Sequence, residues 1–131
     1  MISFIKKYFL STIVIVLVLI LCLMESKQFP APPMENFDKL VHMIMFFGIS
    51  GIIFFDNTGY LRYPSTKFRI FWSSFLFPSF LSGLIEILQN YLTETRFGDW
   101  NDFFFGVIGT FFGFIVSFSI NCFLFRIKNK R

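Results

Sequence analysis

Charged side chains are scarce in this chain. Only 15% of its 131 residues are Asp, Glu, Lys or Arg, whereas 55% are hydrophobic. Soluble domains carry roughly a quarter charged residues, so this composition excludes a soluble protein of this size. The sequence also lacks internal repeats and any polar stretch long enough to form a second domain. We therefore expect one membrane domain that covers residues 1–131.

The chain does contain four long apolar runs. They predict transmembrane helices at about residues 7–24, 37–55, 68–92 and 102–125. A helix of about 20 residues crosses a hydrocarbon core of roughly 30 Å. Between the runs, a proline-rich segment follows the first helix and a turn-rich Asp56-Asn57-Thr58-Gly59 string opens the next connection. The predicted fold class is therefore all-α: a polytopic membrane protein with four transmembrane helices.

Pro78 falls inside the third predicted helix. It cannot donate a backbone hydrogen bond, so it frees the carbonyl of Ser74 and should distort the helix. We expect a nearby serine or a packed helix to satisfy that carbonyl.

Cysteine is rare too, and the chain contains only Cys22 and Cys122. In a four-span arrangement they lie near opposite membrane surfaces, far beyond the roughly 7 Å Cα separation of a disulfide. No small-x-small cleavage pattern follows the first run, whose end reads Leu21-Cys22-Leu23-Met24-Glu25. We therefore expect an uncleaved first helix and cysteines that serve packing.

Basic residues are distributed unevenly between the two predicted membrane sides. One side carries nine of the 12: Lys6, Lys7, Arg62, Lys67, Arg69, Arg126, Lys128, Lys130 and Arg131. The positive-inside rule then places both termini in the cytoplasm. The basic tail is typical of segments that fix topology and contact membrane lipids, so we predict no nucleic-acid partner despite the net charge of +4.

Polar residues at the opposite, outer side form the candidate binding site. They come from three predicted helices and a short loop: Asp38, Lys39 and His42; Glu86 and Gln89; Arg96, Asp99 and Asp102. Ionisable groups at membrane depth are costly, so a converging set is a functional-site hypothesis. Asp38 and His42, four residues apart, can hydrogen-bond each other. We expect one cluster.

Three glycines continue the helical face that begins at Asp102. Gly106, Gly109 and Gly113 lie four, seven and eleven residues later, and the last two form a GxxxG pair. Small residues allow close helix approach, so these positions predict helix packing.

The chemistry of the polar cluster admits four interpretations. It could be a ligand-binding pocket, or a structural clasp in which Arg96 pairs with Glu86 or Asp99. It could also be a catalytic site or a metal site. No HExxH-like metal spacing and no specific Ser–His–Asp arrangement occurs. We therefore assign no catalytic residue and predict no metal and no cofactor.

The polar residues also resemble a family. Asp38-Lys39-x-x-His42, then Glu86-x-x-Gln89, then Arg96-x-x-Asp99-x-x-Asp102 is similar to the VanZ-like membrane proteins over residues 30–118. That family is associated with resistance to teicoplanin and other lipoglycopeptide antibiotics. Its pattern usually has Asn four residues after the second Asp, where this chain has Gly106. The resemblance implies four helices in the bacterial inner membrane.

From the residues and the resemblance together we expect a cell-envelope protein that is not an enzyme. Its outer pocket would bind lipoglycopeptide-like antibiotics or lipid-linked cell-wall molecules. Two alternatives stay open. One is an intramembrane enzyme acting on a lipid or cell-wall precursor, with His42 and Glu86 as acid and base. The other is a subunit of an oligomer or larger membrane complex.

Overall fold

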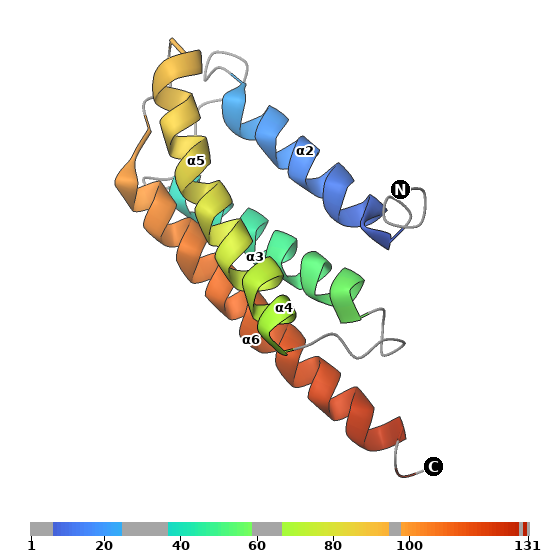
Figure 1. The fold of residues 1–131 in the computed structure, drawn as a ribbon. Coiled ribbons are helices and arrows are strands. Elements are labelled where there is room, and N and C mark those ends of the chain that lie inside the picture. The colour runs from blue at the N-terminus through green and yellow to red at the C-terminus, as the bar shows by residue number, and fades with distance from the viewer. Residues whose placement is uncertain (1–6, 25–36, 59–66, 95–97, 129, 131) are drawn as a thin grey trace.

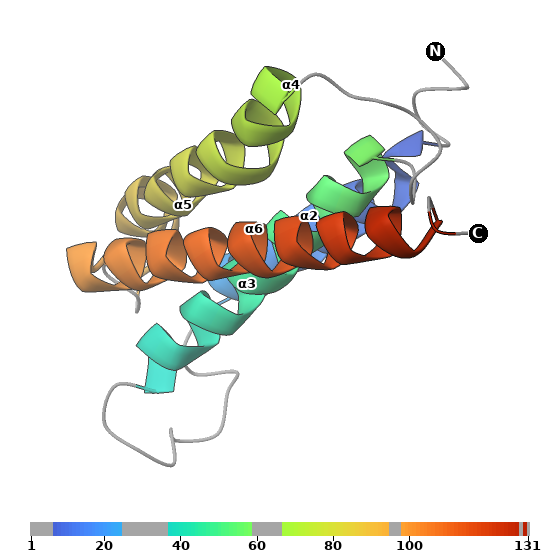
Figure 2. The ribbon, with the colours of Figure 1, turned by 90° about the horizontal axis from the view of Figure 1, so that it is seen from below.

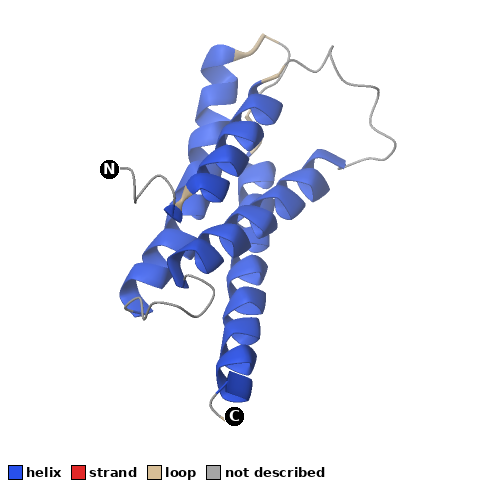
Figure 3. Cartoon of the chain, turned by 90° about the vertical axis from the view of Figure 1, so that its right-hand side faces the viewer, coloured by secondary structure: helices blue, strands red, loops and turns tan. Residues whose placement is uncertain are grey.

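Every regular element in the described part of the chain is a helix (Figures 1 and 3). The computed structural model describes residues 7–24, 37–58, 67–94, 98–128 and 130. Its elements are α2 (Phe9–Leu23), α3 (Phe37–Thr58), α4 (Lys67–Phe71), the π-helix η2 (Trp72–Leu76), α5 (Phe77–Leu92) and α6 (Trp100–Lys128). Because α4, η2 and α5 follow one another without a break, the described residues form four helical segments.

Three of these segments are long and apolar enough to cross a membrane. They are Phe37–Thr58, Lys67–Leu92 and Trp100–Lys128. The fourth, α2, is apolar but has only 15 residues, or roughly 22 Å at 1.5 Å per residue. The all-helical prediction is confirmed, and three of the four helical segments have the length and composition of membrane spans. The predicted proline-rich connection lies outside the described residues.

The second predicted helix ends too early. We expected a turn to open at Asp56, but α3 continues through Thr58. The side chains of Asn57 and Thr58 donate to the carbonyls of Ile53 and Phe54, four residues earlier. Turn-forming residues are therefore accommodated in the last helical turn, because their polar groups bond within the helix or to its neighbours.

Helix α3 contacts each of the other described helical segments, and α6 lies beside it (Figure 2). It contacts α6 along most of its length, and α2 lies against α3 and α5. The buried core includes Cys22, Phe46, Ile49 and Ile85, which come from α2, α3 and α5. Most other large apolar side chains are exposed, including Phe80, Leu92 and Phe123. Apolar surface of this extent on every helix fits contact with lipid tails rather than water.

Pro78 lies at the junction between the π-helix η2 and α5. The carbonyl that the proline frees, that of Ser74, accepts a hydrogen bond of 2.7 Å from Ser50 Oγ of α3. The expected compensation by a packed helix is therefore confirmed.

Candidate functional site

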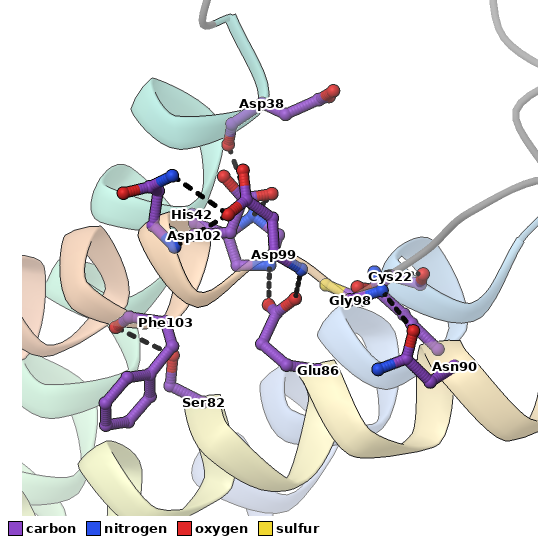
Figure 4. A network of polar contacts seen from close by, with 12 residues as sticks. Cys22, Asp38, His42, Ser82, Glu86, Asn90, Gly98, Asp99, Asp102 and Phe103 are labelled. Atoms are coloured by element: carbon purple, nitrogen blue, oxygen red, sulfur yellow. Dashed lines mark hydrogen bonds and ion pairs between the residues drawn. The ribbon is translucent and has the colours of Figure 1, made fainter.

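Three helices bring an imidazole and two carboxylates together at one end of the bundle (Figure 4). His42 lies in the second turn of α3, Glu86 in the last two turns of α5 and Asp102 in the first turn of α6. Glu86 Oε1 is 3.3 Å from His42 Nε2, and Asp102 Oδ2 is 3.9 Å from His42 Nδ1. The predicted convergence is confirmed for these three residues, named the His42 cluster below.

Contacts at a ring nitrogen and at a ring face fix the orientation of the His42 side chain. Its Nδ1 atom is 3.2 Å from the carbonyl oxygen of Asp38, one helical turn earlier. The expected pairing of these two residues therefore involves the backbone of Asp38. The ring also stacks on Phe46, with 6.3 Å between centroids, and Cys22 of α2 lies beside it. Only 4% of His42 is exposed.

Glu86 is held by the chain segment that precedes α6. Its Oε2 atom accepts a hydrogen bond of 2.9 Å from the backbone N–H of Asp99. One residue earlier, the N–H of Gly98 donates to Asn90 Oδ1 over 2.9 Å. A Cβ atom at Gly98 would overlap the carbonyl of Glu86, so only glycine lets this segment lie directly on α5.

Asp99 caps α6. Its Oδ1 atom accepts from the N–H of Asn101 at 2.8 Å, and its carbonyl accepts from the N–H groups of Asp102 and Phe103. A side-chain oxygen bonded to the second N–H of the helix is the standard N-cap arrangement. Asp99 therefore fixes where α6 begins, and that places Asp102 beside His42.

The remaining predicted site residues have different surroundings. Gln89 is buried, and its amide donates to the carbonyl of Cys22 at 2.9 Å, so it joins α5 to α2. The side chains of Asp38 and Lys39 are exposed and half-buried, respectively, at the rim of the cluster. Arg96 lies outside the described residues, and so does the predicted clasp with Glu86 or Asp99 that depends on it.

The three predicted packing glycines lie where α6 meets other helices. A Cβ at Gly109 would overlap the backbone carbonyl of Met43, and one at Gly113 would overlap that of Phe47. A Cβ at Gly106 would overlap Ser82 Oγ. The absence of side chains therefore permits the close approach of α6 to α3 and α5. Gly106 serves the contact with α5.

Sequence reasoning missed a second buried polar group, at the far end of α3. It is named the Asp56 cluster and consists of Tyr8, Ser11, Asp56, Asn57, Arg69 and Ser73. Asp56 Oδ2 accepts from both the backbone N–H and the hydroxyl of Ser11. Because Ser11 lies in the first turn of α2, this carboxylate satisfies an N–H group that has no partner within its own helix.

The rest of the Asp56 cluster is a chain of hydrogen bonds. Arg69 donates to the hydroxyl of Tyr8, and that hydroxyl donates to Asn57 Oδ1, each over 2.9 Å. Asn57 Nδ2 donates to Ser73 Oγ at 2.7 Å. A sequence signal did exist: Ser11, early in one apolar run, and Asp56, at the end of the next, share one depth in antiparallel helices.

A comparison with protein-family models, curated proteins and solved structures finds no match to this chain.

Proposed function

We propose that this protein is a multi-span protein of the bacterial inner membrane that binds an amphiphilic envelope ligand at the His42 cluster. The ligand would be a lipoglycopeptide-like antibiotic or a lipid-linked cell-wall molecule. The observation that carries the proposal is the convergence of His42, Glu86 and Asp102 from three helices. Charged groups at membrane depth are costly and are retained mainly where they bind a ligand or an ion, or transfer a proton.

The position of the cluster fits a ligand that lies partly in lipid. At 1.5 Å per residue, His42 is about 8 Å and Glu86 about 9 Å along its helix from the nearer end. Asp102 is about 3 Å from the start of α6. With both termini in the cytoplasm, as the basic residues predict, this depth corresponds to the outer leaflet. A ligand's acyl chain would then contact the apolar helix faces while its polar part reaches the cluster.

The charges of the cluster favour a cationic group on the ligand. Two carboxylates surround the imidazole, and Asp38 adds a third acidic side chain at the exposed rim. Amine-bearing parts of an antibiotic would pair with these acids, whereas Lys39 offers contact to an anionic part. The resemblance to VanZ-like proteins supports the antibiotic as the first ligand to test.

The test is lipoglycopeptide susceptibility of a host that expresses the protein. The wild-type chain should raise the inhibitory concentration of teicoplanin. Glu86→Gln and Asp102→Asn should return it to the vector level, with equal amounts of protein in the membrane fraction. Asp56→Asn makes the same carboxylate-to-amide change in the Asp56 cluster and should keep protection. Full protection by well-expressed Glu86→Gln and Asp102→Asn proteins would refute the site.

A wild-type protein that gives no protection would exclude the antibiotic as ligand. Mass spectrometry of lipids that co-purify with the protein then tests the lipid-linked ligand. Wild-type protein should retain an envelope lipid that Asp102→Asn protein lacks.

The contact between His42 and Glu86 also favours a second candidate, an intramembrane enzyme. At 3.3 Å, the two side chains lie just beyond the roughly 2.6–3.2 Å of an acid–base hydrogen bond, a contact that often shortens when substrate binds. Purified protein would then convert a lipid-linked precursor, and both His42→Gln and Glu86→Gln would abolish turnover without loss of ligand binding. Binding without turnover would leave the non-enzymatic function.

A further inference from the structure

Two atoms in the His42 cluster are buried without a hydrogen-bond partner. Within the described part of the chain, neither His42 Nε2 nor Glu86 Oε1 has one, and the side chains are only 5% and 4% exposed. The atoms face each other at 3.3 Å, but without hydrogen-bond geometry. A buried polar atom left unsatisfied costs about 1–3 kcal/mol, so an arrangement that buries two side by side calls for a third partner.

The spacing of these atoms suits a metal ion. Zinc lies about 2.0–2.1 Å from His nitrogen and carboxylate oxygen, so two such ligands at a tetrahedral angle are roughly 3.3 Å apart. His42 Nε2 and Glu86 Oε1 have that separation. Asp102 offers a third ligand: one ligand atom of each of the three residues lies within 4.8 Å of the others, and the Asp102 Oδ2 atom is 3.9 Å from His42 Nδ1. A side-chain rotation of Asp102, which is only half-buried, would complete the site.

The surrounding contacts orient the two ligands. Metal-binding histidines usually donate their second ring N–H to a carbonyl or carboxylate, and ligating carboxylates are themselves hydrogen-bonded. His42 Nδ1 is 3.2 Å from the Asp38 carbonyl, which favours a proton on Nδ1 and a free lone pair on Nε2. Glu86 Oε2 accepts from the N–H of Asp99, which leaves Oε1 facing the histidine.

The donor set also indicates which metal. Two carboxylates in an apolar bundle need a compensating positive charge, and a divalent cation supplies two. Imidazole favours zinc, iron, copper or nickel over magnesium and calcium, which prefer oxygen ligands alone. The sequence alone led us to predict no metal, but from these observations we infer that His42, Glu86 and Asp102 bind one divalent transition-metal ion of the zinc class. Three protein ligands leave a fourth position for water or for an oxygen of a ligand.

Metal titration of the purified full-length chain tests this inference. The protein is held in detergent, its affinity tag removed, and freed of metal with a chelator. Zn²⁺ should bind at one ion per chain, measured by elemental analysis after desalting, and should raise the thermal unfolding midpoint. Mg²⁺ and Ca²⁺ should leave the midpoint unchanged. Loss of a supporting contact alone weakens metal sites 10–100-fold, so Glu86→Gln and Asp102→Asn should each weaken zinc binding by more than about 100-fold.

Asp56→Asn is the matched control, because it changes a buried carboxylate in the same way at the other end of α3. It should retain one zinc per chain. Co²⁺ added to wild-type protein gives a further readout that needs no variant: bound cobalt of low coordination number shows intense visible absorption, and Zn²⁺ should displace it. Wild-type protein that binds neither ion would overturn the inference, as would equal zinc affinity in wild-type, Glu86→Gln and Asp102→Asn proteins.

This inference goes beyond the proposed function, and the two fail separately. Zinc binding is measured without antibiotic or lipid-linked ligand, so a metal site stands even if the host gains no protection. A protein that protects the host but binds neither Zn²⁺ nor Co²⁺ when purified would keep the ligand site and lose the metal.

Discussion

The two ends of α3 carry buried carboxylates in opposite situations. Asp56 accepts two hydrogen bonds from Ser11 and stands beside a continuous chain of donors and acceptors. Glu86 is buried as deeply, but its Oε1 atom faces an imidazole nitrogen with which it shares no hydrogen bond. A satisfied polar group is explained by the fold that it holds together. A buried polar group without a hydrogen-bond partner, such as Glu86 Oε1, is not explained by the fold, and we therefore propose that the ligand binds at the His42 cluster.

The elements that hold each cluster differ as well. The Asp56 cluster joins α2, α3 and the α4–η2 segment by side-chain hydrogen bonds. The His42 cluster depends on where helix backbones lie, because glycines let α6 approach α3 closely and a cap fixes where α6 begins. At the Asp56 end, hydrogen bonds between polar side chains join the helices. At the His42 end, close packing of the helices positions the polar side chains.

The largest expected effect is at the glycine contact that supports the His42 cluster. In Gly109→Ala, the new methyl group collides with the carbonyl of Met43, so α6 must move away from α3. Overpacking typically costs 1–3 kcal/mol, and against backbone we expect about 3 kcal/mol of unfolding free energy. Detergent titration followed by circular dichroism measures it.

Gly48→Ala is the control for that change, since a Cβ at Gly48 meets nothing within 4 Å. Removal of a glycine from a helix should leave stability unchanged or raise it by about 0.5–1 kcal/mol. Equal losses in the two variants would show that α3 and α6 are not held by close backbone approach.

The second expected effect contrasts the two carboxylates directly. Asp56→Ala leaves the N–H and hydroxyl of Ser11 without their acceptor, which should cost about 2 kcal/mol. Glu86→Gln keeps an acceptor for the Asp99 N–H and offers an amide N–H to His42 Nε2, so stability should change by less than about 0.5 kcal/mol. Both are measured in metal-free protein by the same titration. A loss for Glu86→Gln as large as for Asp56→Ala would make Glu86 a structural residue and remove the contrast.

A third effect separates the cap from the ligands. Asp99→Ala removes the acceptor for the Asn101 N–H and should cost about 1 kcal/mol, while Asp99→Asn, which still caps, should cost little. Neither change removes the backbone N–H that bonds Glu86, so zinc affinity should fall far less than in Asp102→Asn. A zinc affinity lost in Asp99→Asn, with stability intact, would instead place Asp99 among the ligands.

The fold was predictable because a membrane-spanning helix needs about 20 mostly apolar residues, a pattern that is easily seen in a sequence. Long apolar runs predicted the helices, and the Ser74 carbonyl that Pro78 frees is satisfied by a packed helix, as backbone chemistry requires. The meeting of His42, Glu86 and Asp102 was predictable from their shared depth.

Other parts of the site could not be predicted from depth alone. Gln89 shares a helix face with Glu86, yet it bonds to the backbone of α2, because rotation about the helix axis decides which neighbour each side chain meets. The Asp56 cluster was not predicted because Asp56-Asn57-Thr58 is a sequence typical of a turn, so these residues were assigned to a connection between helices. These residues stay helical because their side chains bond to carbonyls of α3 itself and to the packed neighbours Ser11 and Ser73.

The smallest expected effect is at the exposed edge of the Asp56 cluster. Arg69 is the cluster's cation, but it is exposed and donates to the neutral hydroxyl of Tyr8 rather than to a carboxylate. Exposed charged contacts contribute about 0.2–1 kcal/mol, so Arg69→Gln should lower the unfolding free energy by no more than about 0.5 kcal/mol. Tyr8→Phe removes the partly buried link to Asn57 as well and should cost about 1 kcal/mol. The double variant should cost no more than Tyr8→Phe alone, because Arg69 acts through that hydroxyl. If Arg69→Gln alone matched the loss from Asp56→Ala, charge rather than the buried hydrogen-bond chain would organise this end of the bundle.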